Sequence, residues 1–148
     1  MAHLRQQIRE YVGGTLVSGL TTTGTKVYQS RLYPMADDNL PGLLVYTTTE
    51  ESEPDVMGST RNMDRAMNLV IEGFAKTATN LDDKLDTIAD EVETAMAGSP
   101  TINSLAKNSW LASTEIALMG EGETPVGVIT MIYSVIYRTQ DSSPDTAA

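Results

Sequence analysis

The feature that most constrains this chain is a segment near its C-terminal end that is apolar on both faces of an extended strand. Within residues 126–137, Ile129, Met131 and Tyr133 alternate with Val128 and Ile132. A strand that is apolar on both faces has to be covered on both sides. We therefore expect this segment to be a central strand of a sheet, or to be covered by a neighbouring chain.

Further strands are predicted by composition and by two-residue periodicity. Residues 42–49 are almost continuously apolar or β-branched, which is typical of a strand inside a sheet. Residues 62–76 carry an apolar row on one face and a mixed row on the other. Residues 110–118 alternate in the same way, and a short strand is expected at residues 26–32. The sheet is thus predicted to have about four to five strands.

Two helices are predicted by apolar residues at helical spacing. Leu4, Ile8 and Leu16 place one amphipathic helix within residues 3–18. A second helix follows Asn80, a candidate N-cap, and ends near residue 98; its apolar stripe comprises Leu81, Leu85, Ile88, Val92 and Met96. The expected fold class is α+β, with a mostly antiparallel mixed sheet and two helices packed on one face.

The 148 residues fit one domain, which we place at residues 1–138. Residues 139–148 lack apolar periodicity, so we expect a disordered C-terminal tail. No apolar run approaches the ~20 residues that a bilayer span requires, so no membrane partner is expected.

The charge balance and the absence of cysteine exclude several functions. The chain has 20 acidic and 10 basic residues, a net charge of -10 and no cysteine. Binding to phosphates requires clustered Lys and Arg, so sequence-specific nucleic-acid binding is not expected. Without cysteine there can be no disulfide, thiolate metal ligand or cysteine nucleophile.

The sequence offers few parts for catalysis. The single histidine, His3, lies in the N-terminal segment, and a nucleophile needs a base held against it. No phosphate-binding glycine motif opens a helix. Asp82 and Asp83 are explained by the favourable dipole at a helix start, so a metal cluster with Asp86 is disfavoured. We expect no enzyme, and no catalytic, cofactor-binding or metal-binding residues.

The densest charge lies between the second and third predicted strands, where residues 50–59 read as an exposed acidic loop. The candidate interface residues in and after it are Glu50, Glu51, Glu53, Asp55, Arg61 and Arg65. The two arginines can pair with Glu53 or Asp55 of the same chain, or with carboxylates of another subunit, where complementary charge would fix orientation. Pairing within the chain is slightly favoured. Trp110, the only tryptophan, is interpreted as a core anchor rather than a partner contact.

The order of these segments resembles a known family. An N-terminal Leu4-Arg5-x-x-Ile8 helix precedes a short Val27-Tyr28 strand and the sequence LPGLLVYT at residues 40–47. After the acidic segment come the long strand, the Leu81-Asp82-x-x-Leu85 helix and the closing strand at residues 128–133. Over residues 3–138 this pattern is similar to the tail terminator proteins of long-tailed phages, in particular the minor tail protein U family of lambda-like phages. The Thr-rich residues 19–25 and the tail beyond residue 138 depart from it.

The resemblance implies a virion structural protein made in the host cytoplasm and located at the head-proximal end of the tail. Members of that family form a six-membered ring that caps the tail tube, stops its polymerisation and presents the surface for head attachment. The implied partners are other copies of the chain, the tail tube protein and a head-completion or connector protein, with the genome passing through the ring. Two alternatives stay open: a head–tail connector or tail-completion ring, and a small soluble ligand-binding domain or enzyme.

Overall fold

The computed structural model describes residues 2–29, 41–77, 79–119 and 126–148. These residues form two α-helices, one π-helical turn and six strands. In chain order they are α1 (Leu4–Tyr11), η1 (Val12–Leu16), β1 (Val27–Tyr28), β2 (Gly42–Pro54), β3 (Asn62–Lys76), α2 (Leu81–Ala97), β4 (Asn108–Met119), β5 (Val126–Gln140) and β6 (Ser143–Ala147).

The strands form one sheet in the order β1-β2-β3-β5-β4, with β6 paired to β5 as well. Only the β1–β2 pair is parallel; the other neighbours are antiparallel. β5 lies between β3 and β4 over most of its length, as its two apolar faces predict. The α+β fold with a mostly antiparallel sheet is therefore confirmed.

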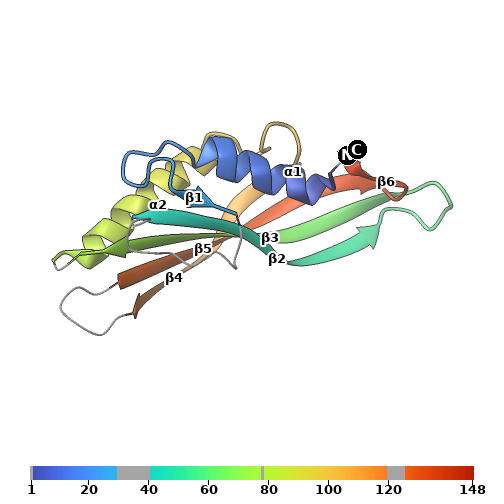
Figure 1. Cartoon of the computed structure of the whole chain (residues 1–148). Helices are drawn as coiled ribbons and strands as arrows, with labels where there is room; N and C mark the ends of the chain where they lie inside the picture. Colours follow the sequence, from blue (N-terminus) through green and yellow to red (C-terminus); the bar gives the residue numbers. More distant parts are fainter. Residues whose placement is uncertain (1, 30–40, 78, 120–125) are drawn as a thin grey trace.

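Both helices lie on the same face of the curled sheet (Figure 1). The buried core lies between them and one row of side chains from each of β2, β3 and β5, for example Leu43, Leu69 and Met131. The predicted stripe of α2 faces this core, with Leu85, Ile88, Val92 and Met96 buried. Burial of these apolar surfaces is the main favourable term for the fold.

α2 approaches the sheet closely because glycine occupies the strands beneath it. A Cβ atom added to Gly73 of β3 would lie 2.8 Å from Cγ2 of Ile88, and one added to Gly127 of β5 would lie 2.8 Å from Cδ1 of Leu85. Those separations are shorter than carbon–carbon contact distances. The two glycines thus fix how deeply the helix sits on the sheet.

The predicted first helix and acidic loop differ from the structure at their ends. α1 ends at Tyr11 and continues as the π-helical turn η1, which contains Gly13 and Gly14, two poor helix formers. The predicted loop at residues 50–59 is a strand up to Pro54, because β2 stays paired with β3 as far as the Pro54–Met63 pair. Only β1, two residues long, is described within the strand predicted at residues 26–32, and residues 30–32 lie outside the described residues.

Three other expectations differ from the structure. Residues 139–148, predicted to be a disordered tail, hold the end of β5 and the strand β6, which pairs with β5 at Thr139 and Gln140. Asn80 precedes α2 in the left-handed conformation (φ 56°), and its side chain does not cap the helix. Trp110, predicted to be a core anchor, is 48% exposed because β4 is the outer neighbour of β5.

Candidate assembly interface

The predicted interface residues lie on a β-hairpin that we call the arm, residues 50–65. It consists of the distal part of β2, the beginning of β3 and the turn between them, and it extends past the N-terminal end of α1 (Figure 1). The last residues of β5 pair with the arm, from Asn62–Gln140 to Arg65–Tyr137. The arm is therefore a three-stranded extension of the sheet.

A bulge in β2 decides which way the first acidic side chain points. The register shifts between Thr47, opposite Leu69, and Glu50, opposite Met67, so Thr48 and Thr49 together face one residue of β3. Simple alternation would place Thr47 and Glu50 on opposite faces of the sheet. With the bulge, Glu50 lies on the same face as the core and meets α1.

Glu50 is the centre of a cluster of four side chains, which we call the Glu50 cluster: Glu50, Arg5, Arg65 and Tyr137. Arg5 of α1 donates from Nε to Oε1 and from a terminal nitrogen to Oε2, both at 3.2 Å. Arg65 of β3 donates to Oε2 at 3.2 Å, and the Tyr137 hydroxyl of β5 donates to Oε1. One carboxylate thus joins the first helix to three neighbouring strands.

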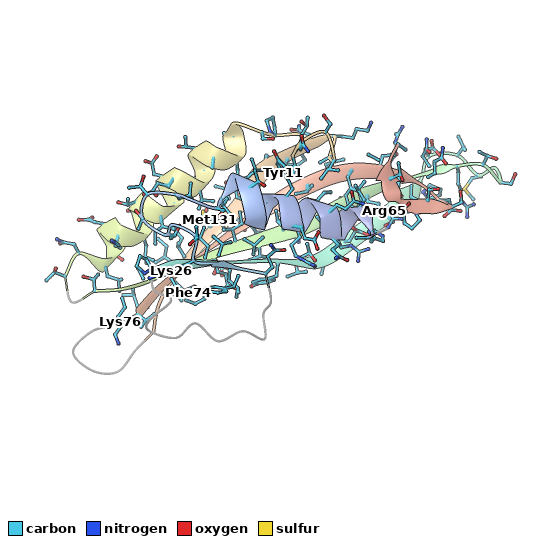
Figure 2. All side chains as sticks on the ribbon, turned by 45° about the horizontal axis from the view of Figure 1, so that its top comes forward. Tyr11, Lys26, Arg65, Phe74, Lys76 and Met131 are labelled. Atoms are coloured by element: carbon cyan, nitrogen blue, oxygen red, sulfur yellow. The ribbon has the colours of Figure 1, made fainter. Side chains whose placement is uncertain are left out.

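The members of the Glu50 cluster that lie on strands are largely removed from water. The side chains of Glu50 and Arg65 are 12% and 13% exposed, whereas that of Arg5 is 39% exposed. Arg65 also donates to the Thr139 hydroxyl at 3.2 Å and lies 5.9 Å from the centre of the Tyr137 ring. Charge-assisted hydrogen bonds in such surroundings are stronger than exposed ones. Figure 2 shows Arg65 beside the N-terminal end of α1, with Tyr11 at the other end of the helix.

His3 and Tyr137 have pKa values set by this environment. The backbone N–H of Arg5 donates to Nδ1 of His3 at 3.1 Å, so the imidazole caps α1. Burial, followed by the positive charges of Arg5 and Arg65, lowers the pKa of His3 from 6.5. Burial, with the hydrogen bond to Glu50, raises the pKa of Tyr137 to about 12. Both groups are therefore uncharged at neutral pH.

The tip of the arm, residues 55–61, is a closed turn with apolar side chains in solvent. The Asp55 N–H donates to the Asn62 carbonyl at 3.0 Å, and the Asn62 N–H donates to Oδ1 of Asp55 at 2.9 Å. Val56 is 53% exposed and Met57 87% exposed. The turn is held at its base while it presents two large apolar side chains to solvent.

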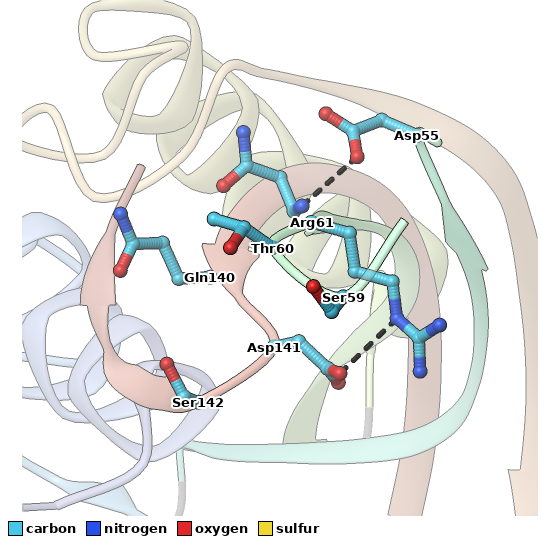
Figure 3. Close-up of a pocket in the computed structure, with 8 residues that line it drawn as sticks. Asp55, Ser59, Thr60, Arg61, Gln140, Asp141 and Ser142 are labelled. Atoms are coloured by element: carbon cyan, nitrogen blue, oxygen red, sulfur yellow. Dashed lines mark hydrogen bonds and ion pairs between the residues drawn. The ribbon is translucent and has the colours of Figure 1, made fainter. Parts of the chain in front are cut away.

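A polar hollow lies between the arm tip and the β5–β6 turn (Figure 3). Arg61 donates to Asp141 across it at 3.1 Å, with both side chains exposed to more than a third. An exposed pair of this kind contributes little to stability. The Arg61–Asp141 pair links the arm tip to the turn between β5 and β6.

The other carboxylates of the arm stay on its outer face. Glu51 and Glu53 are exposed and, by register, lie on the face opposite the helices, where Glu53 stands across from Asp64. Asp64 accepts a hydrogen bond from Arg138 of β5. Glu51 and Glu53 make no ion pair among the residues that the structure describes.

The structure thus divides the six candidate residues into two groups. Glu50 and Arg65 are tied together inside the chain, and Glu51, Glu53, Asp55 and Arg61 line the exposed part of the arm. Both arginines pair within the chain, but with Glu50 and Asp141 rather than with the expected Glu53 or Asp55. Sequence reasoning missed Arg5, Tyr137 and the bulge. A bulge leaves no periodic signal in a run of threonines, so nothing in the sequence would have revealed it.

A second exposed apolar surface lies on β4 and the end of α2. Trp110, Ile116 and Leu118 of β4 are each about half exposed or more. A bulge between Leu111 and Ser113 turns Trp110 to the face of Ser134 and Ser113, away from Thr114 and Ile116. A groove of about 420 Å³ lies between this strand and the end of α2. It is lined by Glu93, Met96, Ala97, Pro100, Ser109, Trp110, Leu111 and Tyr133.

Neither a metal centre nor a membrane span emerges within residues 2–29, 41–77, 79–119 and 126–148. No three His, Cys, Asp or Glu side chains are placed there to share a cation. None of the helices in those ranges is long and apolar enough to cross a bilayer.

The chain is similar to known proteins among solved structures. No protein-family model matches the chain, and no curated protein matches it. Among solved structures, it is similar to a chain of the virion of a native gene transfer agent particle, with 14% sequence identity and a TM-score of 0.45 over 93% of this chain and 92% of that one.

Proposed function

We propose that this chain is a virion structural protein that acts as a tail terminator. In this role copies of the chain close into a ring, which we take to be a hexamer, at the head-proximal end of the tail tube. The ring stops addition of tube subunits and offers its other face to a head-completion or connector protein. The proposal starts from the family resemblance of residues 3–138, and the α+β fold observed is the one predicted from the order of helices and strands in the sequence.

The observation that carries the proposal is the braced arm. An isolated two-stranded hairpin is marginally stable in water. Here the Glu50 cluster ties the base of the arm to α1, β3 and β5, while the tip keeps two apolar side chains in solvent. A monomer gains nothing from holding an apolar tip away from its core, whereas a subunit that must reach a neighbour does.

Ring closure by identical copies requires two different surfaces on each subunit that complement one another. The described residues offer exposed apolar side chains at two separate places, the arm tip and the groove beside Trp110 of β4. The exposed carboxylates Glu51 and Glu53 add charge to the arm, which contributes to orientation more than to affinity. These features support a function performed by assembly rather than by chemistry.

The direct test is a tube-length assay with the tube protein of the same virion. Added in small amounts, the chain is expected to stop tube elongation and to appear as a ring at one end in negative-stain images. The double variant Glu51→Lys and Glu53→Lys should lose capping while unfolding at the same temperature. Asp86→Lys with Asp90→Lys, the same charge change on exposed positions of α2, is the control. Tubes of unchanged length in the presence of excess protein would contradict the proposal.

A charge reversal at Arg65 does not test the interface, because it would also disrupt the Glu50 cluster. The Arg65 side chain is 13% exposed and its guanidinium is bound to Glu50, so reversing its charge would place two carboxylates together inside the Glu50 cluster. Arg61 pairs only on the surface with Asp141, and Arg61→Glu is the reversal that leaves the fold intact.

A further inference from the structure

The exposed large hydrophobic side chains of the described residues lie on the arm tip and on β4. The tip carries the pair Val56 and Met57; on β4, Trp110 lies beside the groove, whereas Ile116 and Leu118 lie on the other face of the strand. Single exposed apolar residues are ordinary, but grouped ones mark interaction sites. A second copy of the chain is a partner that can bring the tip pair to the groove beside Trp110.

We propose that the tip pair of one copy inserts into the groove beside Trp110 of the next copy. This inference rests on the proposed function, because it names the subunit contact by which a ring would close. The groove holds about 420 Å³ and is lined mainly by apolar side chains from α2, β4 and β5. Methionine is flexible enough to fill such an irregular space, and tryptophan is the residue type most often found at energetic centres of interfaces.

The two surfaces cannot meet within one chain. Trp110 pairs with Ser134 of β5, whereas the arm tip begins beyond the Asn62–Gln140 pair. From Ser134 to Gln140 the strand spans roughly 20 Å, and β5 itself lies between β4 and the arm. β4 also runs away from the arm, toward the opposite end of the molecule (Figure 1). The contact is therefore head-to-tail, the kind that closes rings.

A basic residue next to the strand side of the groove complements the acidic arm. Lys107, directly before β4, is exposed and makes no ion pair among the described residues. Glu51 and Glu53 of the arm are exposed and unpaired as well. Glu93 lies on the α2 side of the groove, so the acidic face of the arm is directed toward Lys107 and away from the helix.

Cysteine crosslinking tests the contact, because the natural chain has no cysteine. The variants Met57→Cys and Ala97→Cys are mixed and treated with a short thiol-reactive crosslinker. We expect mixed dimers in excess of the dimers that each variant forms alone, and a covalent ladder from the doubly substituted chain. Thr25→Cys, an exposed position on a turn outside both surfaces, replaces Ala97→Cys in the control.

The inference is overturned if Met57→Cys crosslinks no better to Ala97→Cys than to Thr25→Cys. Should rings still form or tubes still be capped, the tail-terminator proposal stands and only this contact is lost. If the chain also stays monomeric and never caps tubes, both fail.

Substitutions give a second measurement by sedimentation. Met57→Asp and Trp110→Ala should each weaken self-association about tenfold or more, the effect of losing a central interface side chain. Lys107→Glu should weaken it too, whereas Lys84→Glu on α2 and Thr25→Asp should not. Equal dissociation constants for Met57→Asp and Thr25→Asp would contradict the contact.

Discussion

Replacing Glu50 by glutamine tests whether the Glu50 cluster braces the arm. The substitution keeps the size of the side chain but removes the charge that accepts two hydrogen bonds from Arg5 and one from Arg65, each 3.2 Å long. Removing one partner of a buried ion pair costs about 3–5 kcal/mol, because the other charge stays buried. Arg5 is 39% exposed and is partly solvated after the change, so we expect a loss of about 2–4 kcal/mol.

Thermal and urea unfolding measure this loss. For a chain of this length, 1 kcal/mol corresponds to about 2–4 °C, so Tm should fall by roughly 4–16 °C. Glu51→Gln, at the adjacent exposed position, is the control and should change stability by less than about 0.5 kcal/mol. Ultraviolet titration adds a local readout, because loss of the Glu50 charge should lower the Tyr137 pKa from about 12. Equal stability of the two variants would refute the bracing role.

Three further predictions concern other parts of the chain. Because the pKa of His3 is lowered in the folded chain, the unfolded chain binds a proton at His3 at a higher pH than the folded chain does. The contribution of His3 to stability is therefore full above about pH 6.5 and falls as the pH drops below that value. His3→Asn, which can still cap α1, should reduce this dependence of stability on pH in unfolding curves. Gly73→Ala should cost about 1–3 kcal/mol because its Cβ would meet Ile88 at 2.8 Å, whereas Gly58→Ala, with open space around it, should not destabilise the protein. Trp110 fluorescence should be readily quenched by acrylamide in the dispersed chain and protected on assembly; equal quenching in both states would contradict a role at the interface.

The elements that sequence predicted well are those with an uninterrupted period. β5 is apolar on alternate residues of both faces and is flanked by β3 and β4 along most of its length. α2 runs from Leu81 to Ala97, and its apolar stripe faces the core as expected. For α2 and for the core-facing row of β5, burial follows directly from local periodicity, whereas Ile132 and Ile136 on the other face of β5 are only half-buried.

The features that sequence missed depend on pairing between distant segments. The bulge at Thr48 and Thr49 turns Glu50 toward Arg5, a residue 45 positions earlier in the chain. The strand β6, in a segment of tail-like composition, forms because the end of β5 extends beyond β4 and can accept a partner. A polar segment can thus become a strand when a neighbouring edge is available, and composition alone does not show that edge.

The interface at residues 50–65 stays a prediction, and the structure adds which of its charges are exposed. Charge density predicted residues 50–65, and these residues form the arm. Whether a given charge is tied down or exposed is set by strand register: Arg65 faces Glu50 and the core, while Glu53 faces outward beside Asp64. The sequence did not indicate that Val56 and Met57 would be exposed at the tip, because only two apolar residues stand there among acidic ones.

The central claim is that identical copies act together at the end of a tube. Electron cryo-microscopy of tail tubes incubated with the purified chain tests it most directly. The account predicts a closed ring at one end of each tube, with the arm of every subunit reaching the β4 side of the next. Bare tube ends, or isolated single copies scattered along the tube walls, would contradict it.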